Sequence, residues 1–184
     1  MNLPNKLTLL RVCMIPFFVV FAKMGDFAFQ VVAVVIYILA CLTDMLDGRI
    51  ARGRNLVTNF GKFMDPIADK LLVMSAMIVL TTQGRMPDWV CILMLGREFL
   101  VSGFRLVAVE NGVVIAAGPL GKVKTVFQMV STIALMLLVP VEGAPLLGEA
   151  GAIVARVLMY IALALTVVSG ADYIIRNREC IKDM

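Results

Sequence analysis

The sequence predicts an all-α fold: a polytopic membrane protein with six transmembrane helices in one bundle. Its composition is the first reason, since 61% of the 184 residues are hydrophobic and the mean hydropathy is +0.95. Such a chain is too apolar for a soluble domain of this size. The second reason is that six apolar runs divide the chain, each suited in length to a membrane-spanning helix. We interpret residues 1–184 as a single domain.

The six predicted spans follow one another with polar connectors between them. They cover about residues 7–22, 27–46, 66–80, 89–109, 123–139 and 153–175. A polar lead-in, residues 1–6, comes before the first span, and residues 53–64 are expected to form a basic connector. Pro66 suits the first position of the third helix, where a proline loses no helical hydrogen bond. Glycine and proline mark a turn at 84–87 and a connector at 112–121.

An even number of spans places both ends of the chain on one side of the membrane. The other side would then carry only Lys23 and Arg85 as basic residues. The basic residues assigned to the first side are Lys6, Arg49, Arg52, Arg54, Lys62, Lys122, Lys124, Arg176, Arg178 and Lys182. Positive residues accumulate on the cytoplasmic side of membrane proteins. We therefore expect both termini at the cytoplasmic face.

Four aspartates at the inner ends of the second and third spans form the first candidate site. Asp44 and Asp47 are spaced i, i+3 on the second span, and both share one helix face. Asp65 and Asp69 are spaced i, i+4 on the third. If the two helices pack side by side, the carboxylates converge and need cations to stay ionised. Oxygen-only ligation favours magnesium first, then manganese or calcium. A solvated helix end is the plainer interpretation, but it does not explain two spaced pairs.

Small and basic residues continue the helical face of the first aspartate pair. Gly48 and Ala51 leave room for a bulky group, and Arg52 can reach an anion held there. Metal ions, space and a cation together indicate a phosphate or diphosphate site. The chain has no histidine, so aspartate, glutamate or lysine must transfer protons. Nothing in the sequence resembles a nucleic-acid-binding module, so we expect no nucleic-acid partner.

Charged residues in the fourth span and before the fifth form a second candidate site. Arg97, Glu98 and Arg105 each add about 2.5–3.5 kcal/mol to the free energy of membrane insertion, or roughly 7–10 kcal/mol together. An internal ion pair through Glu98 would neutralise one arginine and leave the other, so we favour an anion site. Lys122 and Lys124 lie at the start of a helix after glycines. They either anchor the chain at the membrane surface or bind a phosphate, and both interpretations stay open.

Eight residues of the sequence fill every position of a known family signature. They are spaced as Asp44-x2-Asp47-Gly48-x2-Ala51-Arg52-x8-Gly61-x3-Asp65-x3-Asp69. This is the signature of the CDP-alcohol phosphatidyltransferases, and the chain resembles that family over most of its length. The resemblance implies a six-helix transmembrane bundle, a homodimer among membrane lipids, and an active site open to the cytoplasm. Residues 3–11, 96–105 and 121–125 further resemble the bacterial branch that forms phosphatidylglycerophosphate, which implies the cytoplasmic membrane of a bacterium.

The resemblance also implies a reaction and a role for each candidate residue. Enzymes of that branch join CDP-diacylglycerol to sn-glycerol 3-phosphate and release CMP. Two divalent metal ions would be held by Asp44, Asp47, Asp65 and Asp69, of which Asp69 would also be the general base. The CDP moiety would contact Gly48, Ala51 and Arg52, with Asn5 and Thr8 nearby. The acceptor's phosphate would be held by Arg97, Arg105, Lys122 and Lys124.

Other functions are compatible with parts of this pattern. Within the family, the acceptor could instead be serine, inositol or phosphatidylglycerol; serine and inositol would need the basic residues of the fourth and fifth spans much less. A membrane prenyltransferase also binds a diphosphate through aspartates and magnesium, but the fixed spacing after Asp47 argues against it. A metal-ion transporter is a third class, and such proteins often pair broken helices in two halves. Here the charged residues gather between 44 and 124, with no counterpart in the last span.

Overall fold

The computed structural model describes residues 3–53, 59–110, 118–139 and 147–177. This described part is helical and contains no strand, which confirms the all-α prediction. Its six helices are α1 (Leu3–Lys23), α2 (Phe27–Gly53), α3 (Asn59–Thr82), α4 (Asp88–Glu110), α5 (Pro119–Leu138) and α6 (Gly148–Arg176). Each apolar run of the sequence therefore forms the body of one helix.

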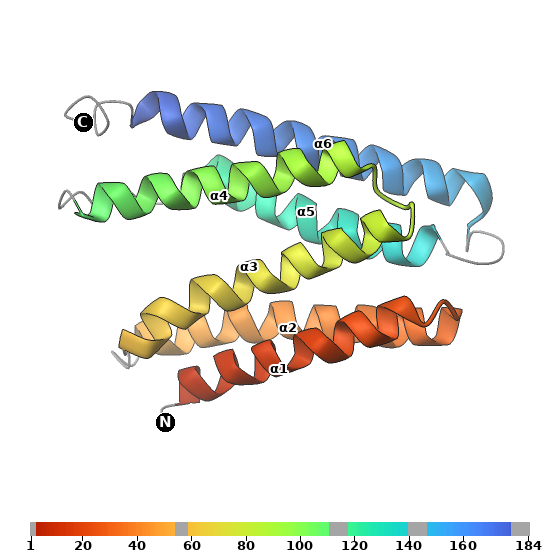
Figure 1. The fold of residues 1–184 in the computed structure, drawn as a ribbon, viewed down its shortest axis with the longest axis horizontal. Helices are drawn as coiled ribbons and strands as arrows, with labels where there is room; N and C mark the ends of the chain where they lie inside the picture. The colour runs from red at the N-terminus through yellow and green to blue at the C-terminus, as the bar shows by residue number, and fades with distance from the viewer. Residues whose placement is uncertain (1–2, 54–58, 111–117, 140–146, 178–184) are drawn as a thin grey trace.

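Two of the turns depend on glycine. Gly25, between α1 and α2, has φ of 81°, and Gly84, between α3 and α4, has φ of 69°. Side chains rarely tolerate this left-handed region, whereas glycine enters it freely. The chain can therefore reverse within a few residues at both places, so α2 returns along α1 and α4 begins directly after α3 (Figure 1).

The start of α3 differs from the prediction. The sequence places a basic connector at residues 53–64 and a helix start at Pro66, but α2 continues to Gly53 and α3 begins at Asn59. The prediction is wrong because a proline inside a helix removes a single backbone hydrogen bond, a loss that the rest of a long helix can outweigh. As a consequence, positions 65 and 69 lie within the body of α3 rather than in its first turn.

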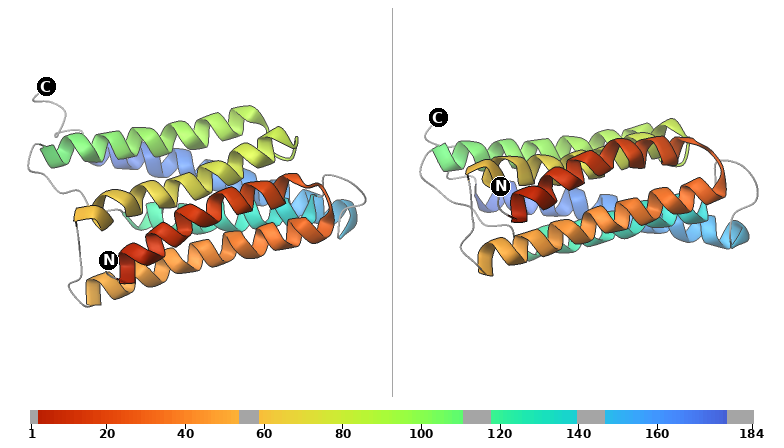
Figure 2. Two further views of the ribbon diagram at one scale, coloured as in Figure 1. Left: turned by 60° about the horizontal axis from the view of Figure 1, so that its bottom comes forward. Right: turned by 90° about the horizontal axis from the view of Figure 1, so that it is seen from below.

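The helices form two groups of three. α1 packs along α2 and α3, while α6 packs along α5 and α4. α2 and α3 contact α5, and α3 also contacts α4, which joins the two groups. α3 and α4 meet at their turn and separate towards their other ends (Figure 1). Two further views show the bundle from other sides (Figure 2).

The two ends of the bundle differ in which helix ends they contain. One end, here called the open end, contains the start of α1, the end of α2 and the start of α3, together with the end of α4, the start of α5 and the end of α6 (Figure 1). The α1–α2 and α3–α4 turns lie at the opposite end. Between the ends is an apolar core whose largest buried side chains include Phe18, Tyr37, Leu72, Met77, Leu80, Met94, Leu135 and Met159.

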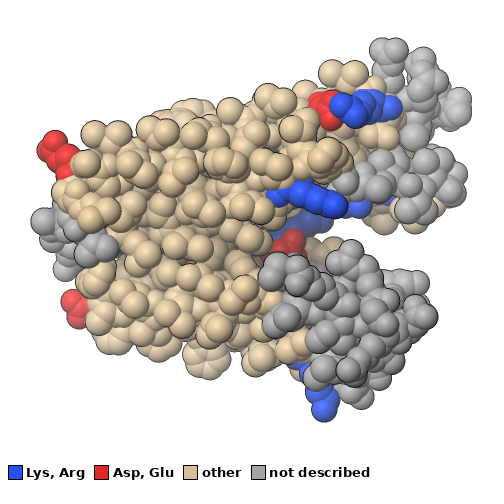
Figure 3. Space-filling model, turned by 180° about the vertical axis from the view of Figure 1, so that it is seen from behind, with Lys and Arg blue, Asp and Glu red and all other residues tan. Residues whose placement is uncertain are grey.

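Apolar helices and an apolar outer surface indicate a membrane protein. Three helical segments are long and apolar enough to cross a bilayer: Asn5–Lys23, Pro119–Leu138 and Gly148–Arg176. The apolar part of α2, Phe27–Thr43, is shorter, and α3 and α4 carry charged residues among their apolar ones. On the face shown in Figure 3, the visible charges lie near the two ends and an uncharged band separates them. Such a band suits the hydrocarbon layer of a membrane.

Candidate active site

A cavity of about 250 Å³ opens between the two helix groups near the open end of the bundle. Residues from α3, α4, α5 and α6 line it. Its charged lining residues are Asp69, Lys70, Arg97, Glu98, Arg105, Lys124 and Asp172. Figure 3 shows lysine and arginine side chains within a hollow at this end, with an acidic side chain beside them. The cavity therefore combines carboxylates with an excess of cations.

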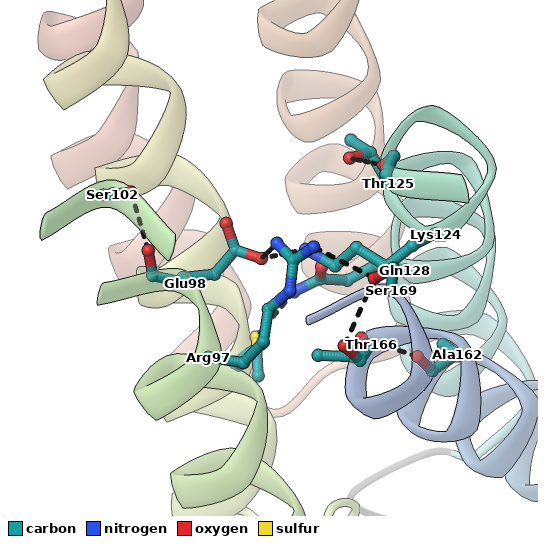
Figure 4. Close-up of polar contacts among 11 residues, drawn as sticks. Arg97, Glu98, Ser102, Lys124, Thr125, Gln128, Ala162, Thr166 and Ser169 are labelled. Atoms are coloured by element: carbon teal, nitrogen blue, oxygen red, sulfur yellow. Dashed lines mark hydrogen bonds and ion pairs between the residues drawn. The ribbon is translucent and has the colours of Figure 1, made fainter. Parts of the chain in front are cut away.

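Glu98 joins the cations of α4 and α5. Lys124 Nζ donates a hydrogen bond to Glu98 Oε1, and Arg97 Nη1 lies 3.3 Å from the same oxygen (Figure 4). Only 3% of Lys124 is exposed, so its charge has to be balanced from within the protein. Ser102 donates to the backbone carbonyl of Glu98 at 2.6 Å. Asp69 of α3 also acts electrostatically on Lys124. Across the whole lining four cationic side chains face three carboxylates, an excess of positive charge that an anion in the cavity would complement.

The Arg97 side chain extends from α4 to α6, where it contacts two small residues, Ser169 and Gly170. Its Nη2 donates to Ser169 Oγ at 2.9 Å (Figure 4). The Ser169 hydroxyl in turn donates to the carbonyl of Thr166 at 3.2 Å, which leaves an oxygen lone pair for the arginine. The neighbouring Gly170 makes the approach possible, because a Cβ there would lie 2.9 Å from Arg97 Cγ. The end of α6 thus sets the direction of the guanidinium.

Asp69 is the member of the family signature whose side chain the structure describes. It is half-buried on α3 and lines the cavity. Six further predicted residues have side chains outside the described part: Asp44, Asp47, Gly48, Ala51, Arg52 and Asp65. Among the described side chains no cluster of three metal ligands occurs. The proposed metal set therefore rests on sequence spacing and on helix position, since α2 ends and α3 begins at the same end of the bundle (Figure 1).

Three of the four residues predicted to hold the acceptor's phosphate line the cavity. Arg97 is half-buried, Arg105 is exposed at the cavity's edge, and Lys124 is buried. Lys122 is exposed, and it is not among the described residues that line the cavity. The two lysines, two residues apart on one helix, thus lie in different surroundings. The position of Lys124 fits an anion site, while the position of Lys122 fits contact with the membrane surface.

The residues of α1 predicted to lie near the CDP moiety form a separate buried group. Asn5, Thr8 and Arg11 are all at most 8% exposed, and their spacing of three places them on one face of α1. Arg11 is fully buried, so it faces the protein interior rather than the lipid. None of the three is among the described residues that line the cavity, so the structure does not bring them to Arg97 and Lys124.

Sequence reasoning missed several residues of the cavity. The sequence assigned no site residue to the last span, yet Ser169, Asp172 and Tyr173 of α6 line the cavity. They reach it because α6 packs along α4. Lys70 was also missed, although an ionisable residue inside an apolar helix is by itself a signal of function. Small α6 residues give no such signal, since serine and glycine are common in membrane helices.

Comparison with known proteins shows to which family this chain belongs. The sequence model of the CDP-alcohol phosphatidyltransferase family matches residues 1–168, which include the whole signature and most of the cavity. The chain belongs to the CDP-alcohol phosphatidyltransferase family. It is therefore an enzyme of the phosphatidyltransferase class.

Curated relatives of this phosphatidyltransferase are similar over nearly their full length. The CDP-diacylglycerol–glycerol-3-phosphate 3-phosphatidyltransferase of Bacillus subtilis (strain 168) is 42% identical, with 98% of this chain and 97% of the relative covered. A probable phosphatidylglycerophosphate synthase of Mycobacterium tuberculosis (strain H37Rv) is 44% identical, with 95% of this chain and 81% of the relative covered. A Rickettsia felis relative with the same name as the Bacillus protein is 38% identical, with 94% and 93% covered.

Proposed function

We propose that this phosphatidyltransferase moves the phosphatidyl group of CDP-diacylglycerol to sn-glycerol 3-phosphate, giving phosphatidylglycerophosphate and CMP. One observation carries the proposal: Asp69, the last residue of the family signature, lines the same cavity as the cations of α4 and α5. The names of the Bacillus and Rickettsia relatives contain the same donor and acceptor. The cavity supports the choice of acceptor independently of those names.

The charge of the cavity favours a phosphorylated acceptor. Arg97 and Lys124 share the carboxylate of Glu98. The cavity lining as a whole has four cationic side chains against three carboxylates, so one positive charge remains for a phosphate. Charge-assisted hydrogen bonds from such groups to a phosphate are stronger than those to a neutral hydroxyl. Serine and inositol bring no phosphate, so these cations would gain little from them.

The arrangement suggests how the reaction proceeds. The cations of the cavity hold the acceptor's phosphate, which brings the primary hydroxyl of glycerol 3-phosphate towards α3. Asp69 then takes the proton of that hydroxyl as general base. The hydroxyl oxygen attacks the lipid-linked phosphorus in line, and CMP leaves. Holding both reactants in one cavity supplies much of the rate enhancement by proximity.

Divalent ions fit the chemistry of the signature residues. Members of the family generally depend on divalent metals, and carboxylate oxygens are ligands that magnesium prefers, with manganese also suitable. Two such ions would neutralise charge on the diphosphate. The residues proposed to hold them are Asp44, Asp47, Asp65 and Asp69. Those proposed to contact the CDP moiety are Gly48, Ala51 and Arg52, with Asn5 and Thr8.

CMP release from CDP-diacylglycerol by the purified protein tests the proposal. The assay compares sn-glycerol 3-phosphate with serine, inositol and phosphatidylglycerol, each with magnesium. We expect release with glycerol 3-phosphate alone. It should be lost on adding a chelator and reduced about 10²–10⁴-fold in Asp69→Asn, because a general base typically contributes that much. Turnover with another acceptor instead would keep the family but overturn the assignment of the cation cluster. Metal uptake into vesicles without any CMP release would favour a transporter.

We further propose six membrane spans, with both termini and the cavity at the cytoplasmic face of a bacterial cytoplasmic membrane. The position of the first helix start and the last helix end at one end of the bundle supports an even number of crossings (Figure 1). A reporter that is active only outside the cytoplasm should stay inactive when fused to either terminus. Fused after Gly84, it should be active. Cross-linking in native membranes tests the proposed homodimer, which should give a band of twice the monomer mass.

A further inference from the structure

An apolar groove of about 290 Å³ lies on the outer face of the bundle between α3 and α4. It is lined by Pro66, Ile67, Lys70, Leu71, Met74 and Phe99. The α3 residues follow one another at alternating spacings of one and three, so they form one continuous face of that helix. Apart from Lys70, all the lining side chains are apolar, and Phe99 supplies the opposite wall from α4. The groove is therefore suited to a hydrocarbon chain rather than to a polar ligand.

The groove is continuous with the polar cavity. Pro66 and Lys70 line both spaces. A smaller recess beside them is lined by Lys70 and Met74 of the groove and also by Asp69 and Lys124 of the cavity. This continuity follows from the course of the helices, because α3 and α4 separate towards the open end (Figure 1). A molecule with a polar head and an apolar tail could thus occupy both spaces at once.

Lys70 lies where the two spaces meet. Its side chain is half-buried, and it makes no hydrogen bond or ion pair with another described residue. Asp69, Glu98 and Lys124 also line the recess beside it, and the carboxylate of Glu98 is bonded to Lys124. A cation in this position, between a polar cavity and an apolar groove, is complementary to an anionic group that carries hydrocarbon chains. The phosphate of a phospholipid is such a group.

We propose that the groove between α3 and α4 holds an acyl chain of the lipid donor, with Lys70 at the donor's lipid-linked phosphate. This inference rests on the proposed function. The lipid chain enters from the membrane between the two helices, which places the head group beside Asp69. Lys70 and Asp69 line both the cavity and the recess beside it, which places Lys70 near the phosphorus that the acceptor attacks. The groove should therefore favour donors with long acyl chains, whereas Lys70 should bind the phosphate of every donor, whatever its chain length.

A substitution that fills the groove tests the first part. Ile67→Trp adds a large side chain to the groove, and Ile78→Trp is its matched control. Ile78 lies on the same helix and, eleven residues or about three turns further on, on nearly the same face, yet it is outside the groove. We expect Ile67→Trp to raise the KM for dioleoyl CDP-diacylglycerol about tenfold and to leave the KM for a dihexanoyl donor unchanged. Equal KM values for the long-chain donor in both variants would overturn the proposal.

Photolabelling provides a readout that does not require turnover. CDP-diacylglycerol with a diazirine in one acyl chain should label peptides that contain residues 66–74 and 99. Unlabelled CDP-diacylglycerol should block this labelling, while phosphatidylcholine of the same chain length should not. If phosphatidylcholine competes equally, or if the label lies on α5 and α6, the groove binds membrane lipid in general and the proposal is wrong. If labelling succeeds but no acceptor yields CMP, the proposed function fails while the groove stands.

Substitution of Lys70 tests the second part. Lys70→Met should raise the KM of the long-chain and the dihexanoyl donors alike, by about tenfold, because both carry the same phosphate. Lys70→Arg should restore most of the affinity, since the charge is kept. An unchanged donor KM in Lys70→Met, together with a raised KM for glycerol 3-phosphate, would assign Lys70 to the acceptor and overturn this part of the proposal.

Discussion

Arg97 is the residue whose position depends most directly on another helix. Its stem passes over Gly170, and its Nη2 is held by the Ser169 hydroxyl. The Nε of Arg97 is buried and has no hydrogen-bond partner among the described residues. Since the guanidinium has few alternative contacts, small changes on α6 should redirect it. They should affect the acceptor, which the arginine is proposed to bind, more than the donor.

We predict that Gly170→Ala raises the KM for glycerol 3-phosphate. The added Cβ would lie 2.9 Å from Arg97 Cγ, so the arginine has to move. A rise of about tenfold corresponds to a loss of about 1.4 kcal/mol in binding. Steady-state kinetics should show this rise with little change in the KM for CDP-diacylglycerol.

The control for this prediction is Gly103→Ala. Gly103 is an exposed glycine within α4, and a Cβ there meets nothing within 4 Å. Alanine should be neutral or slightly stabilising at such a position, by up to about 1 kcal/mol. If Gly170→Ala and Gly103→Ala change the KM for glycerol 3-phosphate equally, the effect of Gly170→Ala is not steric. Arg97 is then not positioned by α6.

Glu98 should matter for stability as well as for binding. We predict that Glu98→Gln lowers the free energy of unfolding by about 3 kcal/mol, because it leaves the buried Lys124 without its counter-charge. Asp172→Asn is a suitable comparison, since it breaks the exposed pair with Arg176 and should cost less than about 1 kcal/mol. Thermal unfolding in detergent measures both. Equal losses would show that the Glu98–Lys124 pair is no stronger than a surface pair.

At the scale of elements, a polar network holds the turns at the end opposite the cavity. The carbonyl of Ala22, near the end of α1, accepts from Gln30 at 2.8 Å and from Gln83 at 2.6 Å. Helix ends leave such carbonyls without helical partners, so the two amides satisfy a group that burial would otherwise penalise. Gln30 also accepts from Arg85 Nη1 at 2.7 Å. Burial lowers the pKa of Arg85 to about 10, which shows that its surroundings disfavour the charge.

We predict that Gln30→Leu destabilises the protein by about 1–3 kcal/mol without changing either KM. The substitution removes one partner of Ala22 and the acceptor of the buried Arg85, and an unsatisfied buried donor carries a penalty of this size. Gln83→Leu is the matched control, because it removes a bond to the same carbonyl but leaves Arg85 bonded. Chemical unfolding should rank Gln30→Leu as the more destabilising. The reverse order would show that the Arg85 contact contributes little.

The elements that the sequence predicts well are those for which local pattern and packing agree. Long apolar runs separated by glycine give the correct number of helices, because helix formation in a membrane depends mainly on such runs. The start of α3 was mispredicted since Pro66 is a strong local signal, while the helix is stabilised over its whole length. Likewise, charges inside apolar runs pointed to Arg97 and Lys124, whereas Ser169 and Gly170 gain their role only from the packing of α6 on α4. The tertiary contacts of such small residues cannot be predicted from the residues next to them in the sequence.

At the scale of the whole molecule, the cavity lies between two groups of helices. Asp69 comes from the α1–α3 group, whereas Arg97, Lys124 and Ser169 come from the α4–α6 group. α3 and α4 separate towards the open end (Figure 1), and residues of both groups line the cavity there. A ligand bound in the cavity would therefore contact both groups at once. Binding of the acceptor should stabilise the bundle as a whole.

We predict that glycerol 3-phosphate raises the unfolding temperature and that Lys124 is required for the effect. A ligand at 100 times its dissociation constant adds about 2.7 kcal/mol to the stability of the folded state. Lys124→Met should abolish this stabilisation, because the buried cation of the cavity is lost, and Lys122→Met should retain it, because that lysine is exposed and does not line the cavity. Thermal unfolding with and without the acceptor compares two lysines only two positions apart. Loss of stabilisation in Lys122→Met alone would move the acceptor's phosphate out of the cavity to the surface of α5.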